Sequence, residues 1–231
     1  MPIEMIAFDA DDTLWQTELY YQNAIKTLKR MLAKWEKAAT IEEIIDRIEI
    51  NNLPLYGYGI KAFILSLIEA AIEISNGQIS GAAITKILLI GKSMVQADVA
   101  LKPGVRKTLE VLSESHRMMV ITKGDLLDQT DKVKRSGLQR FFSFIEVVND
   151  KTTSAYRLIF DKYHLNPENF LMVGNSLRSD VLPILDIGAS AVYIPSESIW
   201  AHEMVSGFEL PQKGFFELEN IGQLPDLIST M

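Results

Sequence analysis

The spacing of apolar residues divides the chain into two blocks. In the first block, apolar residues recur at intervals of three and four from Gln16 to about Ile50 and again from Ile60 to Ile72. This spacing is typical of the buried face of a helix. A further helix is expected over roughly 81–96, and the Pro and Gly residues of 51–59 indicate a loop. We therefore expect residues 16–96 to be helical throughout.

After residue 104 the pattern changes to short apolar strands that alternate with helices. Strands are expected at 118–122, 144–148, 170–173 and 191–194, and helices at 104–114, 125–136, 153–163, 177–187 and 221–231. Such alternation predicts a parallel sheet with helices on both faces. One more buried strand, 3–8, precedes the helical block. The sequence thus predicts an α/β domain formed by 1–15 and 97–231, with the lid-like helical domain 16–96 inserted after its first strand.

The composition narrows the range of functions. The 231 residues suffice for one large domain or two smaller ones. Lys and Arg number 23 and Asp and Glu 30, so the net charge of −7 argues against nucleic-acid and anionic-membrane partners. The absence of Cys excludes disulfides and thiolate chemistry. The longest apolar segment, 62–74, is too short to span a bilayer, and the start of the chain lacks a basic targeting region. We expect a cytoplasmic protein.

Two carboxylates stand directly after the first strand. Asp9 and Asp11 are spaced two apart, so in an extended chain both side chains point to the same side. Carboxylates held this close require a cation or a proton to compensate them. Such a pair is a candidate for metal binding, or for a division into nucleophile and acid.

The other expected strands also end in polar residues. Thr122 and Lys123 end the second strand, Lys151 follows the third, and Asn175 and Asp180 follow the fourth. The carboxyl ends of parallel strands share one edge of the sheet, where sites of α/β proteins lie. Carboxylates, a lysine and a hydroxyl at one edge suit phosphoryl transfer through an aspartyl intermediate, helped by a divalent cation.

With these motifs the chain resembles the haloacid dehalogenase-like superfamily, whose members are mostly phosphatases with a Rossmann-like core and an inserted helical cap. The superfamily's first motif, Asp-x-Asp-x-Thr, matches residues 9–13. Thr122 matches the second motif and Lys151 the third, while 174–180 matches the fourth imperfectly. The four motifs occur in the superfamily's order along nearly the whole chain.

The resemblance implies roles for these residues. Asp9 would be the nucleophile and Asp11 the general acid and base, while Thr122 and Lys151 would hold the phosphoryl group. Mg²⁺ would be the cofactor and a small phosphorylated metabolite the substrate. Residues expected to contact the substrate are Thr13, Lys123, Gly124 and, in a loop of the cap, Tyr56 and Tyr58.

The expected metal ligands depart from the superfamily pattern at one position. Asp9 and the main-chain carbonyl of Asp11 would bind Mg²⁺, but Asn175 stands where most members carry a metal-binding Asp. An amide oxygen can bind Mg²⁺ without adding negative charge. Asp180 is expected to compensate, either directly or through a bound water.

Several alternatives stay open at this point. A 2-haloacid dehalogenase of the same superfamily would use the same nucleophile, although such enzymes lack an acid at the position of Asp11. A phosphomutase would use the same residues as a phosphatase. A catalytically silent relative that serves as a binding module is favoured only by the neutral Asn175. Asp12 or Thr13 could also cap the following helix, and Tyr56 and Tyr58 could simply pack against their turn.

Overall fold

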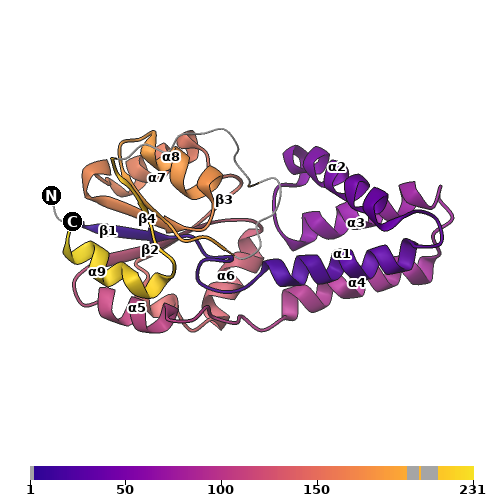
Figure 1. The fold of residues 1–231 in the computed structure, drawn as a ribbon, viewed down its shortest axis with the longest axis horizontal. Helices are drawn as coiled ribbons and strands as arrows, with labels where there is room; N and C mark the ends of the chain where they lie inside the picture. The colour runs from indigo at the N-terminus through magenta and orange to yellow at the C-terminus, as the bar shows by residue number, and fades with distance from the viewer. Residues whose placement is uncertain (1–2, 197–202, 204–212) are drawn as a thin grey trace. The chain divides into compact units, whose positions relative to one another are not determined.

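The chain forms two compact units. The computed structural model describes residues 3–196, 203 and 213–231. One unit comprises Met1–Gln16 and Val99–Met231, and the other comprises Thr17–Asp98 (Figure 1). We call them the sheet unit and the helical unit. The boundaries expected from the sequence, after residues 15 and 96, lie one and two residues before those of the structure.

The sheet unit contains a six-stranded sheet in the order β3-β2-β1-β4-β5-β6, in which all neighbouring strands are parallel. Its strands are β1 (Met5–Phe8), β2 (Arg117–Lys123), β3 (Phe144–Val148), β4 (Phe170–Gly174), β5 (Ser190–Tyr193) and β6 (Phe215–Glu217). This confirms the predicted α/β fold with a parallel sheet. The sequence pattern did not assign β6. Strand β1 is central, and Phe8 is in register with Val120 of β2 and Val173 of β4.

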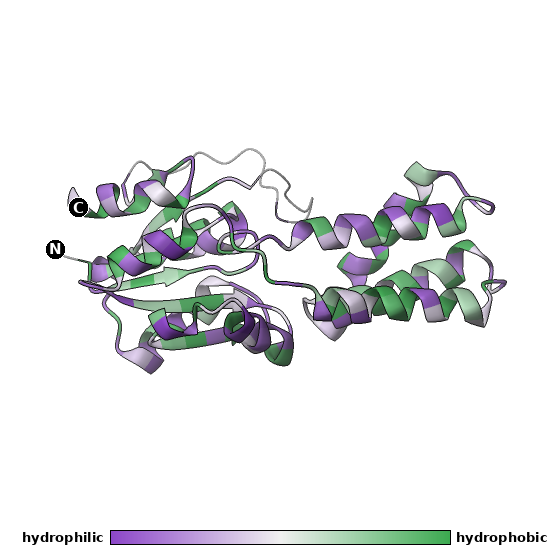
Figure 2. Ribbon diagram, turned by 90° about the horizontal axis from the view of Figure 1, so that it is seen from below, coloured by the Kyte–Doolittle hydropathy of each residue, from purple (hydrophilic) through white to green (hydrophobic). Residues whose placement is uncertain are grey.

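Both faces of the sheet are buried because the central strands are apolar at every position. Ile6 and Phe8 point to the face covered by α5 (Val105–Leu112), α6 (Leu126–Arg135) and α9 (Leu224–Ser229). Met5 and Ala7 point to the opposite face, covered by α7 (Thr153–Tyr163) and α8 (Leu182–Leu185). The two sets of helices lie on opposite sides of the strands in Figure 1, and Figure 2 shows the apolar strands between them. The strand ends are thereby held in fixed positions.

Short turns of other helical types complete the sheet unit. Within the described ranges they are the 3₁₀ turns Gln139–Phe141, Pro167–Asn169 and Ile221–Gln223 and the π-helical turn Leu177–Val181. The helix expected over 177–187 is therefore wrong in type at its start, because its first five residues form the π turn and only 182–185 are α-helical. Isolated π turns are rare and occur frequently at functional sites.

The helical unit has a hydrophobic core of its own. It consists of α1 (Glu18–Leu32), α2 (Ala38–Tyr56), α3 (Ile60–Ile74) and α4 (Gly81–Gln96). Leu28, Ile45, Leu67 and Ile87 are fully buried in this core, one from each helix. Among the described residues, no helix has the length and apolar character needed to cross a membrane.

The loop expected over 51–59 is wrong for its first six residues, since α2 continues through Pro54 to Tyr56. Proline removes one helical hydrogen bond, which disfavours the helix locally. Tertiary contacts offset this loss, because the buried Asn52 donates to the Ser66 hydroxyl and to Glu69 on α3. Gly57, with φ of 70°, then ends the helix.

Candidate active site

Asp9 lies at the carboxyl end of β1, in the middle of the sheet edge. Its amide donates to the Val173 carbonyl over 2.9 Å, which extends the pairing of β1 with β4 by one residue. The chain then turns sharply: the amide of Leu14 donates to the Ala10 carbonyl over 2.8 Å, and Asp12 has a left-handed φ of 61°. Aspartate tolerates this conformation better than most residues. The turn brings Thr13 back toward Asp9.

The carboxylate of Asp9 is buried and contacted on both oxygens. Lys151 Nζ lies 2.5 Å from Oδ1 of Asp9, and the Thr13 hydroxyl donates to Oδ2 over 2.8 Å. The same hydroxyl lies 3.0 Å from Oδ1 of Asn175, at the end of β4. The structure therefore brings together four of the predicted site residues, which come from three separate strand ends.

Lys151 is almost fully buried and lies between two carboxylates. In addition to its contact with Asp9, its Nζ lies 2.7 Å from Oδ1 of Asp180, and both side chains are 1% exposed. Burial opposes the charge of the lysine, but Asp180 and Asp9 outweigh this and raise its pKa above the ordinary value. The lysine is thus a fixed positive charge beside Asp9.

Asp180 is held by the π turn that follows β4. Its Oδ2 accepts the amide of Ser176 over 3.0 Å, while its Oδ1 accepts Lys151. A Cβ atom on Gly174 would lie 2.2 Å from Oδ2 of Asp180, so only glycine permits this approach. Burial raises the pKa of Asp180 and Asp9 adds to this rise, whereas Lys151 opposes it. Both oxygens of Asp180 are thus in contact with protein groups, and its expected part in metal binding stays a prediction.

Asp11 faces a different group of side chains, which sequence reasoning missed. Nζ of Lys132 lies 2.9 Å from each of its carboxylate oxygens, and the Nε atoms of Trp15 and Gln129 each donate over 2.7 Å. Burial raises the pKa of Asp11, but Lys132 and the two donors outweigh this and lower it. The carboxylate is therefore held ionised beside α6.

Lys132 also contacts a second carboxylate, Asp128, whose Oδ2 lies 3.3 Å from Nζ. The side chains of Lys132 and Asp128 are 8% and 4% exposed, so both charged groups are buried away from solvent. Burial raises the pKa of Asp128, and Lys132 opposes this rise. In the sequence, only the i, i+4 spacing of Asp128 and Lys132 indicated an ion pair, and this spacing usually marks an exposed pair on a helix surface.

Thr122 and Gly124 occupy the neighbouring end of β2. Thr122 is 1% exposed and, from the register of Phe8 with Val120, is level with Ala10, one residue beyond Asp9. Gly124 has φ of 140°, and a Cβ atom there would lie 2.9 Å from Nε2 of Gln129. Glycine thus allows Gln129 to reach Asp11.

Lys123 points across the edge of the sheet toward the π turn. Its Nζ forms an ion pair with Glu203 and donates to the Ser179 hydroxyl over 3.0 Å. Glu203 also accepts hydrogen bonds from the hydroxyls of Ser176 and Ser179. Burial raises the pKa of Glu203, but Lys123 and the hydroxyls outweigh this and lower it to about 2. No sequence motif pointed to Glu203 or Ser179.

Tyr56 and Tyr58 belong to the helical unit. Tyr56 is 53% exposed in the last turn of α2, and Tyr58 lies between α2 and α3. Their role in substrate binding stays a prediction.

The donors around Asp9 fit a hard divalent cation. Oδ2 of Asp9 and Oδ1 of Asn175 both lie within 3.0 Å of the Thr13 hydroxyl, so two oxygen donors border the same space. Oxygen donors of this kind suit Mg²⁺. Within the described ranges, no group of three or more His, Cys, Asp or Glu side chains could hold a metal. A metal ion bound here would have one carboxylate oxygen and one amide oxygen from these side chains, and the main-chain carbonyl of Asp11 stays a predicted ligand.

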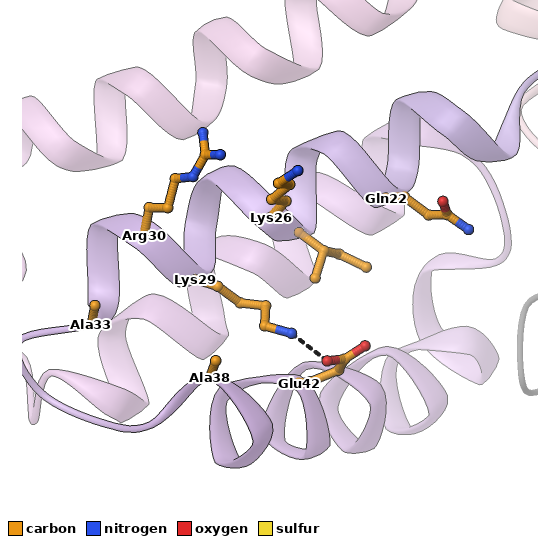
Figure 3. A pocket seen from close by; sticks show the side chains of 8 residues that line it. Gln22, Lys26, Lys29, Arg30, Ala33, Ala38 and Glu42 are labelled. Atoms are coloured by element: carbon orange, nitrogen blue, oxygen red, sulfur yellow. Dashed lines mark hydrogen bonds and ion pairs between the residues drawn. The ribbon is translucent and has the colours of Figure 1, made fainter.

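A separate surface pocket of about 470 Å³ lies in the helical unit, between α1 and α2 (Figure 3). Lys26, Lys29 and Arg30 of α1 contribute to its lining, and Glu42 of α2 pairs with Lys29. The pocket contains none of the candidate residues of the sheet unit. We assign it no part in the chemistry at Asp9.

Comparison with known proteins gives consistent matches. A family model described as haloacid dehalogenase-like hydrolase matches residues 3–188. A glyceraldehyde 3-phosphate phosphatase of Pyrococcus furiosus is 25% identical over 207 residues, which cover 83% of this chain and 80% of that protein. An N-acylneuraminate-9-phosphatase of Rattus norvegicus is 24% identical over 229 residues, which cover 90% of this chain and 92% of that protein.

Among solved structures, a haloacid dehalogenase-like family hydrolase from Xanthomonas campestris superposes with a TM-score of 0.88 and is 33% identical. The match covers 99% of this chain and 91% of that one. Both units of the present chain thus have counterparts in a single related hydrolase.

Proposed function

The chain belongs to the haloacid dehalogenase-like hydrolase family, and from this premise we propose that it is a Mg²⁺-dependent phosphatase acting on a small phosphorylated metabolite. The relatives named above are phosphatases of small phosphorylated molecules. The helical unit would be the cap of this enzyme.

The observation that carries the proposal is the environment of Asp9. A buried carboxylate at a strand end lies 2.5 Å from a buried lysine and 2.8 Å from a threonine hydroxyl. A carboxylate nucleophile must approach an anionic phosphate, so nearby positive charge and hydrogen-bond donors are required. Lys151 and Thr13 would meet this need, and Thr122 stands near the end of the neighbouring strand β2.

In the proposed reaction, a carboxylate oxygen of Asp9 attacks phosphorus and the bond from phosphorus to the ester oxygen breaks. Asp11 gives a proton to the leaving alcohol and later takes a proton from the water that attacks the aspartyl phosphate. Phosphate leaves and the Asp9 carboxylate is restored. Mg²⁺, held by Asp9, Asn175 and the main-chain carbonyl of Asp11, would neutralise phosphate charge.

Lys132 bears on the part played by Asp11. Because it pairs with both oxygens of the Asp11 carboxylate, it favours the ionised form, which is the form that a general base requires. Transfer of a proton to the leaving group would require this pair to open. We therefore propose that substrates with good leaving groups depend less on Asp11 than alkyl phosphates do.

Asp11 also argues against the alternative of a 2-haloacid dehalogenase. Carbon–halogen displacement needs no proton donor for the leaving halide, yet Asp11 has three side chains arranged around its carboxylate. A phosphomutase or a silent binding relative would share the geometry, and turnover separates them from a phosphatase.

The test is hydrolysis of p-nitrophenyl phosphate with Mg²⁺, with EDTA and Asp9→Asn as controls. We expect turnover that EDTA removes and that Asp9→Asn lowers by at least about 10³-fold, the scale of loss for an essential nucleophile. Turnover that survives either control would refute the proposal. Halide release from 2-chloropropionate would instead support the dehalogenase. A panel that includes glyceraldehyde 3-phosphate and N-acylneuraminate 9-phosphate then addresses the substrate.

A further inference from the structure

The Glu203 carboxylate lies among a converging set of hydrogen-bond donors in the sheet unit. Its Oε1 pairs with the Lys123 ammonium, and its Oε2 accepts the hydroxyls of Ser176 and Ser179, the latter over 2.7 Å. The serine residues are 7% and 3% exposed, and the side chains of Lys123 and Glu203 are 17% and 11% exposed. Three donors thus surround one carboxylate in a largely buried place.

The donors are arranged so that only an acceptor fits. The Ser179 hydroxyl already accepts Lys123 Nζ over 3.0 Å, and the Ser176 hydroxyl accepts the Ser179 amide over 3.0 Å. Each hydroxyl therefore directs its own proton toward Glu203. A group that donates hydrogen bonds would leave these protons unsatisfied, whereas an anion satisfies them and also offsets the lysine charge.

This group of donors lies at the same edge of the sheet as Asp9. Lys123 ends β2 and Ser176 follows β4, and these two strands flank β1. The contact between Lys123 and Ser179 therefore crosses the carboxyl end of β1, where Asp9 is located. Ser176 is also joined to the Asp9 centre through Asp180 and Lys151.

We propose that Lys123, Ser176 and Ser179 form a carboxylate-binding subsite for the substrate, and that Glu203 holds the place which the carboxylate of the substrate takes. The substrates would then be phosphate monoesters that also carry a carboxylate, with phosphorus at Asp9 and the carboxylate at Lys123. This inference rests on the proposed phosphatase function and specifies its substrate class.

The test compares two esters that differ at one group, 3-phosphoglycerate with its carboxylate and glycerol 3-phosphate with a neutral hydroxymethyl group. The measured quantity is the ratio of kcat/KM for the acid to that for the neutral ester. We expect a ratio well above one, which falls at least about 10-fold in Lys123→Met and in Ser179→Ala, since each variant removes a hydrogen bond to a charged group. Lys107→Met, at an exposed lysine of α5, should leave the ratio as it is.

Glu203→Gln tests the role of the internal carboxylate. An uncharged amide competes less well for Lys123, so KM for 3-phosphoglycerate should fall while KM for glycerol 3-phosphate changes less. A ratio near one in the unaltered protein, or one unchanged in Lys123→Met, would overturn the subsite. An equal change for both esters in Glu203→Gln would mean that Glu203 acts only on local structure, which would also contradict the inference.

A third comparison separates carboxylates from phosphates. Propane-1,3-diol bisphosphate carries a second phosphate in place of the carboxylate, and propyl phosphate carries none. If the bisphosphate is preferred over propyl phosphate as strongly as 3-phosphoglycerate is over glycerol 3-phosphate, and this preference also depends on Lys123, the assignment to carboxylates is refuted. If neither these esters nor p-nitrophenyl phosphate are hydrolysed, the proposed phosphatase function itself fails. Calorimetric binding of the two glycerol-derived esters then still decides the subsite, because the acid should bind more tightly than the neutral ester and Lys123→Met should remove that difference.

Discussion

Replacing Lys132 with methionine tests whether the buried charges beside Asp11 are arranged as the structure indicates. The lysine side chain is 8% exposed and lies 2.9 Å from Asp11 and 3.3 Å from Asp128. Removing one partner of a buried ion pair costs about 3–5 kcal/mol, because the remaining charge is uncompensated. The Asp11 side chain is 25% exposed, so we expect the lower figure, about 3 kcal/mol, at pH 8.

The cost should depend on pH in a defined direction. In the unaltered protein the pKa of Asp11 is lowered, so its stabilising effect is present above its ordinary pKa and is lost only as the pH falls toward the folded value. Without Lys132, burial would raise the pKa of both Asp11 and Asp128 in the folded state. Protonation between pH 8 and pH 5 would then relieve the cost, so Lys132→Met should be less destabilising at pH 5 than at pH 8.

The assay is denaturant unfolding monitored by circular dichroism at the two pH values. Lys134→Met, at an exposed lysine of the same helix, is the matched control and should change the stability by less than about 0.5 kcal/mol. Asp128→Asn should cost only about 1 kcal/mol, because Lys132 keeps Asp11 as a partner. A loss below 1 kcal/mol for Lys132→Met, or a larger loss at pH 5 than at pH 8, would refute the arrangement.

Three further predictions concern other parts of the molecule. Gly174→Ala should lower turnover at least 10-fold with little effect on the helical unit, because the added methyl group would displace Asp180; unchanged kcat would show that Asp180 does not position Lys151. Asn175→Asp should lower the Mg²⁺ concentration for half-maximal activity several-fold, and an unaltered requirement would remove position 175 from the metal site. Burial, with Asp46 and Glu18 adding, raises the pKa of Glu49 from 4.5 to about 8. The folded state thus loses stability as the pH rises between these values. Glu49→Gln should therefore raise the free energy of unfolding by about 2 kcal/mol at pH 8.5 and by little at pH 4.5. A larger gain at pH 4.5 than at pH 8.5 would contradict the raised pKa of Glu49.

Much of the sheet unit could be predicted from the sequence because its strands are short apolar runs that end in polar residues. Parallel strands bring their carboxyl ends to one edge, so Asp9, Thr13, Lys151 and Asn175 could be expected close together before any contact was known. The structure adds the distances and the order of contacts among them.

The remaining part of the candidate site could not be predicted, because it depends on packing between elements distant in sequence. Lys132 and Asp128 have the spacing of an ordinary surface pair, and only the position of α6 against the Asp9–Trp15 turn buries them. Glu203 meets Lys123 across 80 residues without any motif. Pro54 indicated a loop, but the contacts of Asn52 with α3 keep that segment helical.

Trapping the covalent intermediate tests the central claim of a phosphatase that uses Asp9 as its nucleophile. The protein would be mixed with Mg²⁺ and a phosphate ester, quenched in acid within milliseconds and reduced with borohydride, which converts an aspartyl phosphate into homoserine. Peptide mass spectrometry then locates the modified residue. We predict homoserine at position 9, present with Mg²⁺ and absent with EDTA. Turnover without modification at Asp9, or modification at another residue, would contradict the mechanism.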